Sequence, residues 1–187
     1  MRFLAGFVTA MLLAAVIAFA AVETGAVPAN ADRGPLPGEK WAAHTSLEAT
    51  IKRDAPKTAP FDATPADLEN GAKLYVQNCA ICHGTAHSIP NAIDRGFYVS
   101  APQFVKHDVT DDPVGETYWK IEHGIAWTPM PAFAKTLSER DKWDIAYFLK
   151  NQTSLPPAAN KLWENPQLVA PPTPMPPLPE APSKHGG

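Results

Sequence analysis

The most constraining feature of the sequence is a short run near its middle, Cys79-Ala80-Ile81-Cys82-His83. The chain contains 2 cysteines, and both lie in this run. A framework of several disulfide bonds is therefore impossible, although such frameworks are common in small exported domains. The two thiols and the neighbouring imidazole must instead belong to one chemical site.

Three kinds of site use cysteines at this spacing. On a helical turn, Cys79 and Cys82 can form thioethers to the two vinyl groups of one haem, and His83 then places its imidazole under the iron. A redox-active cysteine pair usually accompanies a βαβ pattern, and a zinc site needs a second pair of ligands at suitable spacing. The sequence contains neither a βαβ pattern nor a second pair of zinc ligands at suitable spacing. The run therefore predicts one covalently bound haem c, with the other two sites as alternatives.

A haem iron takes six ligands, so a second axial ligand is expected from elsewhere in the chain. Met130 is the predicted ligand, because Pro129 and Pro131 restrict the backbone on both sides and can hold its thioether against the iron. The sequence Thr-Pro-Met-Pro occurs again around Met175, but Met130 lies between two predicted helices and Met175 in a proline-rich tail. The remaining candidate ligands are three histidines: His87, His107 and His123.

The segment 62–153 is predicted to form three helices joined by loops, because it has capped helical patterns and no convincing alternating pattern of a β-strand. Capping residues and prolines mark the helix starts, and Gly124 marks one helix end. The predicted helices run from the cap Thr64 to Cys79, from Pro113 to about Glu122, and onward from the cap Ser138.

With these parts in place, residues 62–153 resemble the class I cytochrome c family, within the group of small bacterial mono-haem members. In that family a glycine and an aromatic residue on the helix before the haem motif cross an aromatic-bearing C-terminal helix. Gly71, Tyr75, Trp143 and Tyr147 stand at the matching positions. The resemblance implies an all-α, cytochrome c-like fold with three helices around the haem.

The same family has a Pro-x-Leu segment whose proline carbonyl receives the N–H of the haem-binding histidine. Pro102-Gln103-Phe104 is similar to this segment, so the resemblance implies that Pro102 accepts a hydrogen bond from His83. Pro90 is the alternative acceptor. Three further side chains are candidates for hydrogen bonds to a haem propionate: Arg95, Tyr98 and Trp119.

The N-terminal segment, residues 1–23, is predicted to be membrane-directed. Its apolar run from Leu4 to Val22 has the length of a spanning helix, about 20 residues, rather than that of a signal-peptide core, about 7–15. An uncleaved transmembrane helix is therefore the prediction, and a cleaved signal is the alternative because small-x-small patterns end at Ala20 and Ala31. Since Arg2 should stay inside, the rest of the chain is expected on the periplasmic side of the inner membrane, either anchored or soluble.

Two proline-containing segments flank the predicted haem domain. Residues 24–61 are predicted to be a periplasmic stalk with one helix, from about Glu39 to Arg53. Residues 154–187 are predicted to be a disordered proline-rich tail that contributes nothing to the core.

A haem iron with both axial positions filled has no open site for a substrate, so the predicted function is one-electron transfer and not catalysis. The formal net charge of −3 and the pI near 6.0 give no basic field for nucleic acid, so the expected partners are redox proteins and the membrane. Two alternatives remain at this point. The chain can be a haem-bearing subunit of a larger respiratory or dehydrogenase complex, or a ligand-binding haem sensor or enzyme if Met130 is not bound.

Overall fold

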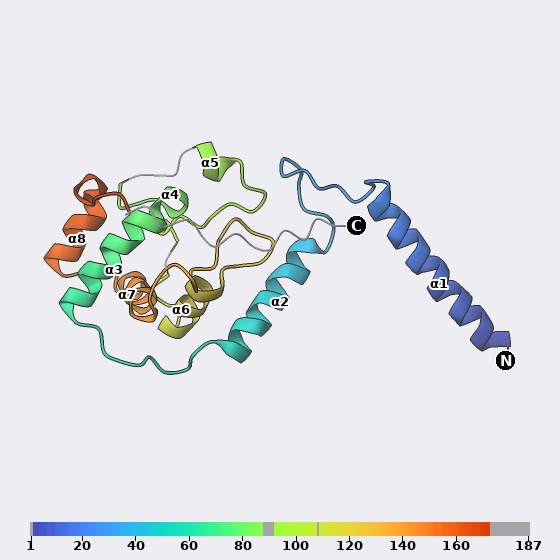
Figure 1. The fold of residues 1–187 in the computed structure, drawn as a ribbon, viewed down its shortest axis with the longest axis horizontal. Helices are drawn as coiled ribbons and strands as arrows, with labels where there is room; N and C mark the ends of the chain where they lie inside the picture. Colours follow the sequence, from blue (N-terminus) through green and yellow to red (C-terminus); the bar gives the residue numbers. More distant parts are fainter. Residues whose placement is uncertain (1, 88–91, 108, 173–187) are drawn as a thin grey trace, which may run out of the picture. The chain divides into compact units, whose positions relative to one another are not determined.

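The regular elements of the protein are helices (Figure 1). The structure, a computed structural model, describes residues 2–87, 92–107 and 109–172, and within these no β-strand is formed. The chain divides into two units, residues 1–34 and 35–187. The prediction of an all-α fold is confirmed.

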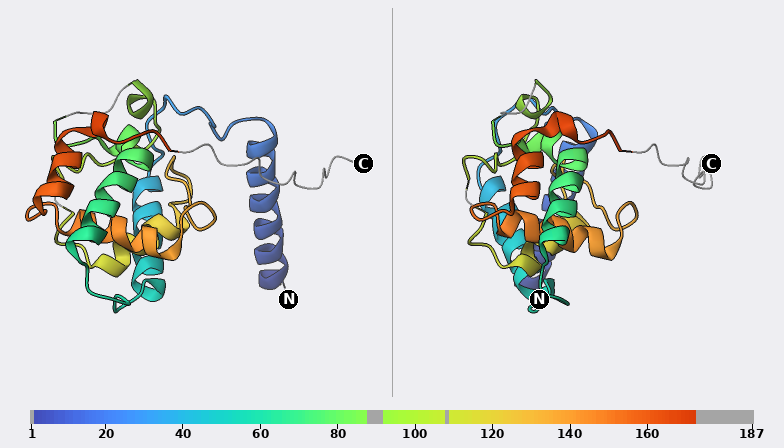
Figure 2. Two further views of the ribbon diagram at one scale, coloured as in Figure 1. Left: turned by 60° about the vertical axis from the view of Figure 1, so that its left-hand side comes forward. Right: turned by 90° about the vertical axis from the view of Figure 1, so that its left-hand side faces the viewer.

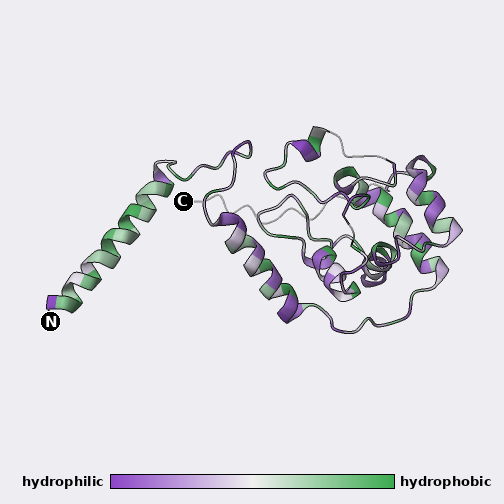
Figure 3. Ribbon diagram, turned by 180° about the vertical axis from the view of Figure 1, so that it is seen from behind, coloured by the Kyte–Doolittle hydropathy of each residue, from purple (hydrophilic) through white to green (hydrophobic). Residues whose placement is uncertain are grey.

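The first unit is dominated by one apolar helix, α1 (Arg2–Glu23), which has no buried residues. Figure 3 shows it hydrophobic along its length apart from its two ends. Its 22 residues give a length of about 33 Å at 1.5 Å per residue. That length matches the hydrocarbon core of a bilayer, about 30 Å thick, so α1 is long and apolar enough to cross a membrane.

The second unit contains the three predicted helices of the haem domain. They are α3 (Pro65–Asn78), α6 (Val114–His123) and α7 (Glu139–Lys150). The predicted signals account for their boundaries. Thr64 and Asp67 form a reciprocal capping box at the start of α3, Ser138 accepts from the Asp141 N–H at 3.1 Å, and Gly124 ends α6 at φ 65°.

Helices α3 and α7 cross in close contact at Gly71. A Cβ added at that position would lie 2.1 Å from the backbone oxygen of Asp144, so only glycine allows this approach. Beside the crossing, Tyr75 is fully buried with its ring 5.3 Å from that of Phe148. The predicted crossing is present, but Phe148 supplies the aromatic partner of Tyr75, whereas Trp143 stacks on Tyr118 at 4.1 Å.

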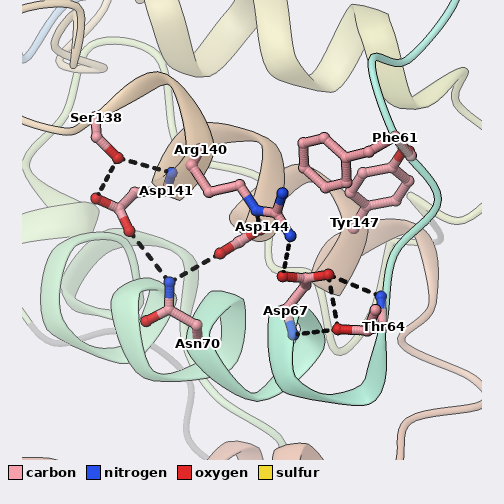
Figure 4. Close-up of polar contacts among 9 residues, drawn as sticks. All are labelled: Phe61, Thr64, Asp67, Asn70, Ser138, Arg140, Asp141, Asp144 and Tyr147. Carbon is pink, nitrogen blue, oxygen red and sulfur yellow. Dashed lines mark hydrogen bonds and ion pairs between the residues drawn. The ribbon is translucent and has the colours of Figure 1, made fainter.

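A polar network ties the first two turns of α3 and α7 together (Figure 4). The Arg140 guanidinium pairs with Asp67 of α3 and with Asp144 of its own helix, where Nε lies 3.3 Å from Oδ1. Asn70 donates from Nδ2 to Asp144 Oδ2 at 2.8 Å and to Asp141 Oδ1 at 3.1 Å. The network fixes the relative orientation of the two helices at the end of the crossing farthest from the cysteines.

The larger, C-terminal part of the predicted stalk packs on the predicted haem domain. Helix α2 (Glu39–Asp54) has the predicted bounds to within one residue, and its Ile51 is buried. The segment that follows touches α6, since a Cβ on Gly115 would lie 2.0 Å from the Pro56 oxygen. Residues 35–61 therefore belong to the same unit as the haem domain, and the stalk prediction is wrong for them.

The segment after α7 is also folded, and the prediction that it contributes nothing to the core is wrong. It forms α8 (Pro157–Glu164) and a 3-10 turn (Pro166–Leu168), and α8 lies alongside α3 in both views of Figure 2. Ala159 and Trp163 are buried in the core. Proline caused the error, because Pro157 occupies the first turn of α8, where its missing N–H costs no hydrogen bond. Residues 173–187, including Met175, lie outside the described residues.

The capping network predicts a pH-dependent stability. Hydrogen bonds from Arg140 and from the Thr64 backbone lower the pKa of Asp67 in the folded protein. The ionised carboxylate therefore stabilises the fold at pH values above the carboxyl pKa of the unfolded chain, about 3.9. This stabilisation is lost as the pH falls through the lowered pKa of the folded state. We expect Asp67→Asn to reduce the unfolding free energy by about 1–2 kcal/mol at pH 7, with the difference shrinking below about pH 4. Urea titrations across this pH range provide the measurement.

Glu69→Gln is the matched control, because Glu69 is an exposed carboxylate on the same helix. It should change the unfolding free energy little at any pH. A deficit in Asp67→Asn that stays constant down to pH 3 would contradict a role for the ionised carboxylate.

Candidate functional site

The two cysteines and the histidine are brought together by one helical turn. After α3 ends, Cys79 begins the short helix α4 (Ala80–His83), and its carbonyl accepts from the backbone N–H groups of Cys82 and His83, both at 3.0 Å. Gly84 then ends the turn at φ 76°, a conformation that favours glycine. Cys79 and Cys82 form no disulfide, and this turn sets the spacing of their side chains.

The imidazole of His83 is held in one orientation by the segment 102–104. Its Nδ1 lies 2.8 Å from the carbonyl oxygen of Pro102. A carbonyl can only accept, so Nδ1 carries the proton and Nε2 keeps a free lone pair, as a metal-binding histidine requires. Phe104 stacks on the imidazole with ring centroids 4.4 Å apart and planes 5° from parallel.

Two more hydrogen bonds attach this segment to the cysteine motif. Gln103 donates from Nε2 to the Cys82 carbonyl at 3.0 Å, and the Phe104 N–H donates to the His83 carbonyl at 3.4 Å. Burial lowers the pKa of His83, opposed by its hydrogen bond to Pro102 and by the charge of Asp94. The imidazole is therefore neutral at neutral pH, which is the form that binds a metal ion.

A cavity of about 340 Å³ lies against the motif. Its walls include Cys79, Cys82 and His83, and also Met130. Most of the other described residues that line it are aliphatic or aromatic. They come from α2, α3, α6, α7 and the loops, and include Leu47, Tyr75, Phe97, Ile121, Ile145 and Leu149.

Met130 reaches the cavity from a loop that folds back on the end of α6. The Met130 carbonyl accepts from the Ile125 N–H at 3.3 Å, and the Phe133 N–H donates to the Ile121 carbonyl at 3.0 Å. The Thr128 hydroxyl donates to the Ile125 carbonyl at 2.8 Å and accepts from the Met130 N–H at 3.2 Å. The loop is thus held by its own hydrogen bonds as well as by its prolines.

The rival histidines do not line the cavity. His87, His107 and His123 are all exposed. His107 Nδ1 lies 3.1 Å from the Gln103 carbonyl oxygen, and the ring centroids of His123 and Trp119 are 4.9 Å apart. Of the candidate second ligands within the described residues, the structure places Met130 beside the cysteine motif.

The candidates for a propionate contact are not at the cavity either. Arg95, Tyr98 and Trp119 are absent from its walls. Among the described residues, the charged side chains that line it are Lys120 and Asp112, which pair at 2.8 Å between Nζ and Oδ2. Sequence reasoning missed this pair because no local pattern distinguishes Lys120 from an ordinary surface lysine of an amphipathic helix.

The chemistry of the thiols does not favour the redox or zinc alternatives. Burial, with a smaller effect from Cys82, raises the pKa of Cys79 to about 12, and burial also raises the pKa of Cys82. Reactive cysteine pairs have lowered pKa values instead. In the part of the chain that the structure describes, no group of three or more His, Cys, Asp and Glu side chains is placed to hold a metal ion.

Comparison with known proteins identifies the family. Residues 66–149 match the family model described as cytochrome c oxidase, cbb3-type, subunit III. Cytochrome c6 of Thermosynechococcus vestitus is 30% identical over 92 residues, which cover 49% of this chain and 76% of that protein. Cytochrome c6 of Synechococcus elongatus is 30% identical over 89 residues, which cover 48% of this chain and 94% of that protein. The chain belongs to the cytochrome c family.

Membership implies a covalent haem c, and the residues of this cytochrome fit that group. Cys79 and Cys82 stand at the spacing of the two thioethers, and His83, whose Nδ1 is used by Pro102, lines the same cavity. A mainly apolar wall suits the macrocycle, and Lys120 offers a positive charge for its carboxylates. The family also makes electron transfer by a c-type haem protein the function of the chain.

The loop geometry makes Gly124 critical for stability. A Cβ at Gly124 would lie 2.7 Å from the Met130 oxygen and from the Ala132 nitrogen, and the residue has φ 65°. We expect Gly124→Ala to lower the unfolding free energy by about 2–5 kcal/mol, through the left-handed conformation and the collision together. Denaturant titration of the purified protein measures this loss.

Gly38→Ala separates the two causes, because Gly38 also has positive φ, 82°, but a Cβ there meets nothing within 4 Å. This control should lose only about 1–2 kcal/mol. Equal losses in the two variants would show that the collision with the Met130 loop is relieved without cost.

Proposed function

We propose that this cytochrome carries single electrons in a respiratory or dehydrogenase chain, with His83 and Met130 as the axial ligands of its haem iron. The observation that carries the proposal is the shared cavity, which brings these two side chains together with both cysteines. When bound, haem c supplies a one-electron change at the iron. If His83 and Met130 both bind the iron, no position would be left for a substrate, and the haem would serve electron transfer alone.

The chain's own residues then have distinct tasks. Cys79 and Cys82 hold the haem covalently, and the Pro102 carbonyl fixes the tautomer and plane of His83. Met130 would supply a thioether to the iron, a ligand that raises the reduction potential relative to a second histidine. The apolar wall excludes water from the site, which also raises the potential by disfavouring the additional positive charge of the oxidised iron.

We assign Lys120 to the haem propionates. It is the cation that lines the cavity within the described residues, and its pairing with Asp112 holds it there. Asp112 is itself fixed, because Lys150 of α7 donates from Nζ to its carbonyl at 3.0 Å. The Lys120 ammonium would therefore be available to the two haem propionates in a mainly apolar cavity.

A second candidate function is a haem-bearing subunit of a larger oxidoreductase complex. The match of residues 66–149 to a family described as an oxidase subunit favours it, since that relative acts within an assembly. Isolation from the native membrane in mild detergent distinguishes the two functions. A stable complex with other subunits supports the second, and a single-chain cytochrome that exchanges electrons freely supports the first.

The ligand assignment predicts a specific spectroscopic loss. Met130→Ala should lower the reduction potential, open the reduced iron to carbon monoxide, and remove the weak far-red sulfur-to-iron band of the oxidised form. Absorption spectra and redox titration of the purified holoprotein provide the measurement.

The control is a chain that ends at residue 172 and so lacks Met175, the other methionine in a Thr-Pro-Met-Pro sequence. Truncation from residue 160 is unsuitable, because it removes the buried Trp163. The shortened chain should keep the far-red band. Loss of the band on truncation, or its persistence in Met130→Ala, would refute the assignment.

We further propose that α1 remains attached and anchors the haem domain on the periplasmic face of the inner membrane. Its length and its lack of buried residues support this. N-terminal sequencing of the mature protein should find residues of α1 intact, and the protein should leave the membrane only in detergent and not in alkaline wash. A mature chain that begins near Val22 or Asp32 would instead make it a soluble periplasmic carrier or one held by partners.

A further inference from the structure

Helix α8 lies outside the residues that match the family model, which end at 149. It nevertheless places Trp163 in the core, 7% exposed, against α3. We propose that α8 is a positioning element for the haem site, in which Trp163 acts through Tyr75 and Phe104 on the orientation of His83. The proposal rests on the function given above, in which His83 binds the iron.

The first line of evidence is a series of ring contacts. The Trp163 ring meets Tyr75 edge-on, with centroids 5.4 Å apart and planes at 71°. Tyr75 in turn lies 6.1 Å from Phe104, and Phe104 stacks on the His83 imidazole at 4.4 Å. Each ring limits the positions open to the next, since close-packed side chains cannot shift independently. The series therefore runs from α8 to the imidazole without a gap.

The second line of evidence is hydrogen bonding to the segment that follows His83. The buried Tyr75 hydroxyl donates to the Gly84 carbonyl at 2.8 Å. Two residues on, the Ala86 N–H points to the Trp163 carbonyl at 3.5 Å. Trp163 is thus linked to the segment around His83 along two routes, by its ring through Tyr75 and by its carbonyl through Ala86.

A further contact keeps the chain after α8 in place. Gln77 of α3 donates from Nε2 to the Ala170 carbonyl at 2.9 Å. The segment 157–170 is thereby fixed to α3 at two places. Helix α8 packs against α3, and Ala170 is bound to Gln77, close to where α3 meets Cys79. A rigid attachment is what a positioning element needs, because a loosely held helix would transmit no restraint to Phe104.

Simple core filling is the alternative, and it makes a different prediction. If Trp163 only fills the core, replacing it with a smaller side chain would lower the stability of the protein but leave the iron environment of the folded protein unchanged. A positioning element would also change the reduction potential and the haem-methyl NMR shifts of the oxidised form, which follow the plane of the bound imidazole, because outer-shell residues tune the ligand they support.

The test uses the full-length holoprotein and three variants: Trp163→Leu, Trp163→Phe and Leu162→Ala. Leu162 is the matched control, since it packs partly buried against the same core from the same helix without an aromatic ring. We expect Trp163→Leu to change the equilibrium constant for one-electron reduction by about threefold to tenfold, tenfold being 59 mV, and to change the haem-methyl NMR shifts of the oxidised form. Trp163→Phe should do so less, and Leu162→Ala should lower the melting temperature alone.

The proposal is overturned if Trp163→Leu behaves as Leu162→Ala does, with a lower melting temperature and an unchanged potential and spectrum. If Trp163→Leu does not fold, an unchanged potential and spectrum in Trp163→Phe overturns it equally. Failure of the underlying function is recognisable separately, because the unaltered protein would then lack a covalent haem or the far-red sulfur-to-iron band of the oxidised form.

Discussion

The site depends on the close approach of α3 and α7 at Gly71. Because the two backbones touch there, α3 is fixed in direction and delivers Cys79 to the cavity, while α7 lines that cavity with Ile145 and Leu149. The same helix holds the loop of Asp112 through Lys150. Any larger residue at position 71 would separate the helices and displace both the cysteine motif and the opposite wall.

Within that frame, the side chains of the two proposed iron ligands, His83 and Met130, are held by different physical means. His83 is restrained by a hydrogen bond to the Pro102 carbonyl, by the stacked ring of Phe104 and by the hydrogen bond from the Phe104 N–H to its own carbonyl. Its orientation is therefore set by groups distant in sequence. Met130 is restrained locally, by a loop whose hydrogen bonds begin and end within about ten residues of it. We infer that the sulfur position is a property of the loop itself, whereas the imidazole position is a property of the whole fold.

The difference between local and distant restraint also explains what the sequence could predict. The motif, the caps Thr64 and Ser138, the stop at Gly124 and the placement of Met130 all depend on short-range signals. The burial of Trp163 could not be predicted in this way, because it depends on Tyr75, and proline-rich composition around α8 suggested an extended tail. Lys120 was missed for the same reason, since only the assembled cavity shows that it faces the haem site.

The central claim is that Cys79 and Cys82 hold one haem c covalently. Its most direct test is mass spectrometry of the denatured protein and of the proteolytic fragment that contains residues 79–83, before and after extraction with acidified organic solvent. We expect the haem mass to remain on this fragment after extraction. Release of the haem into the solvent, with both thiols left free, would contradict the claim and the function built on it.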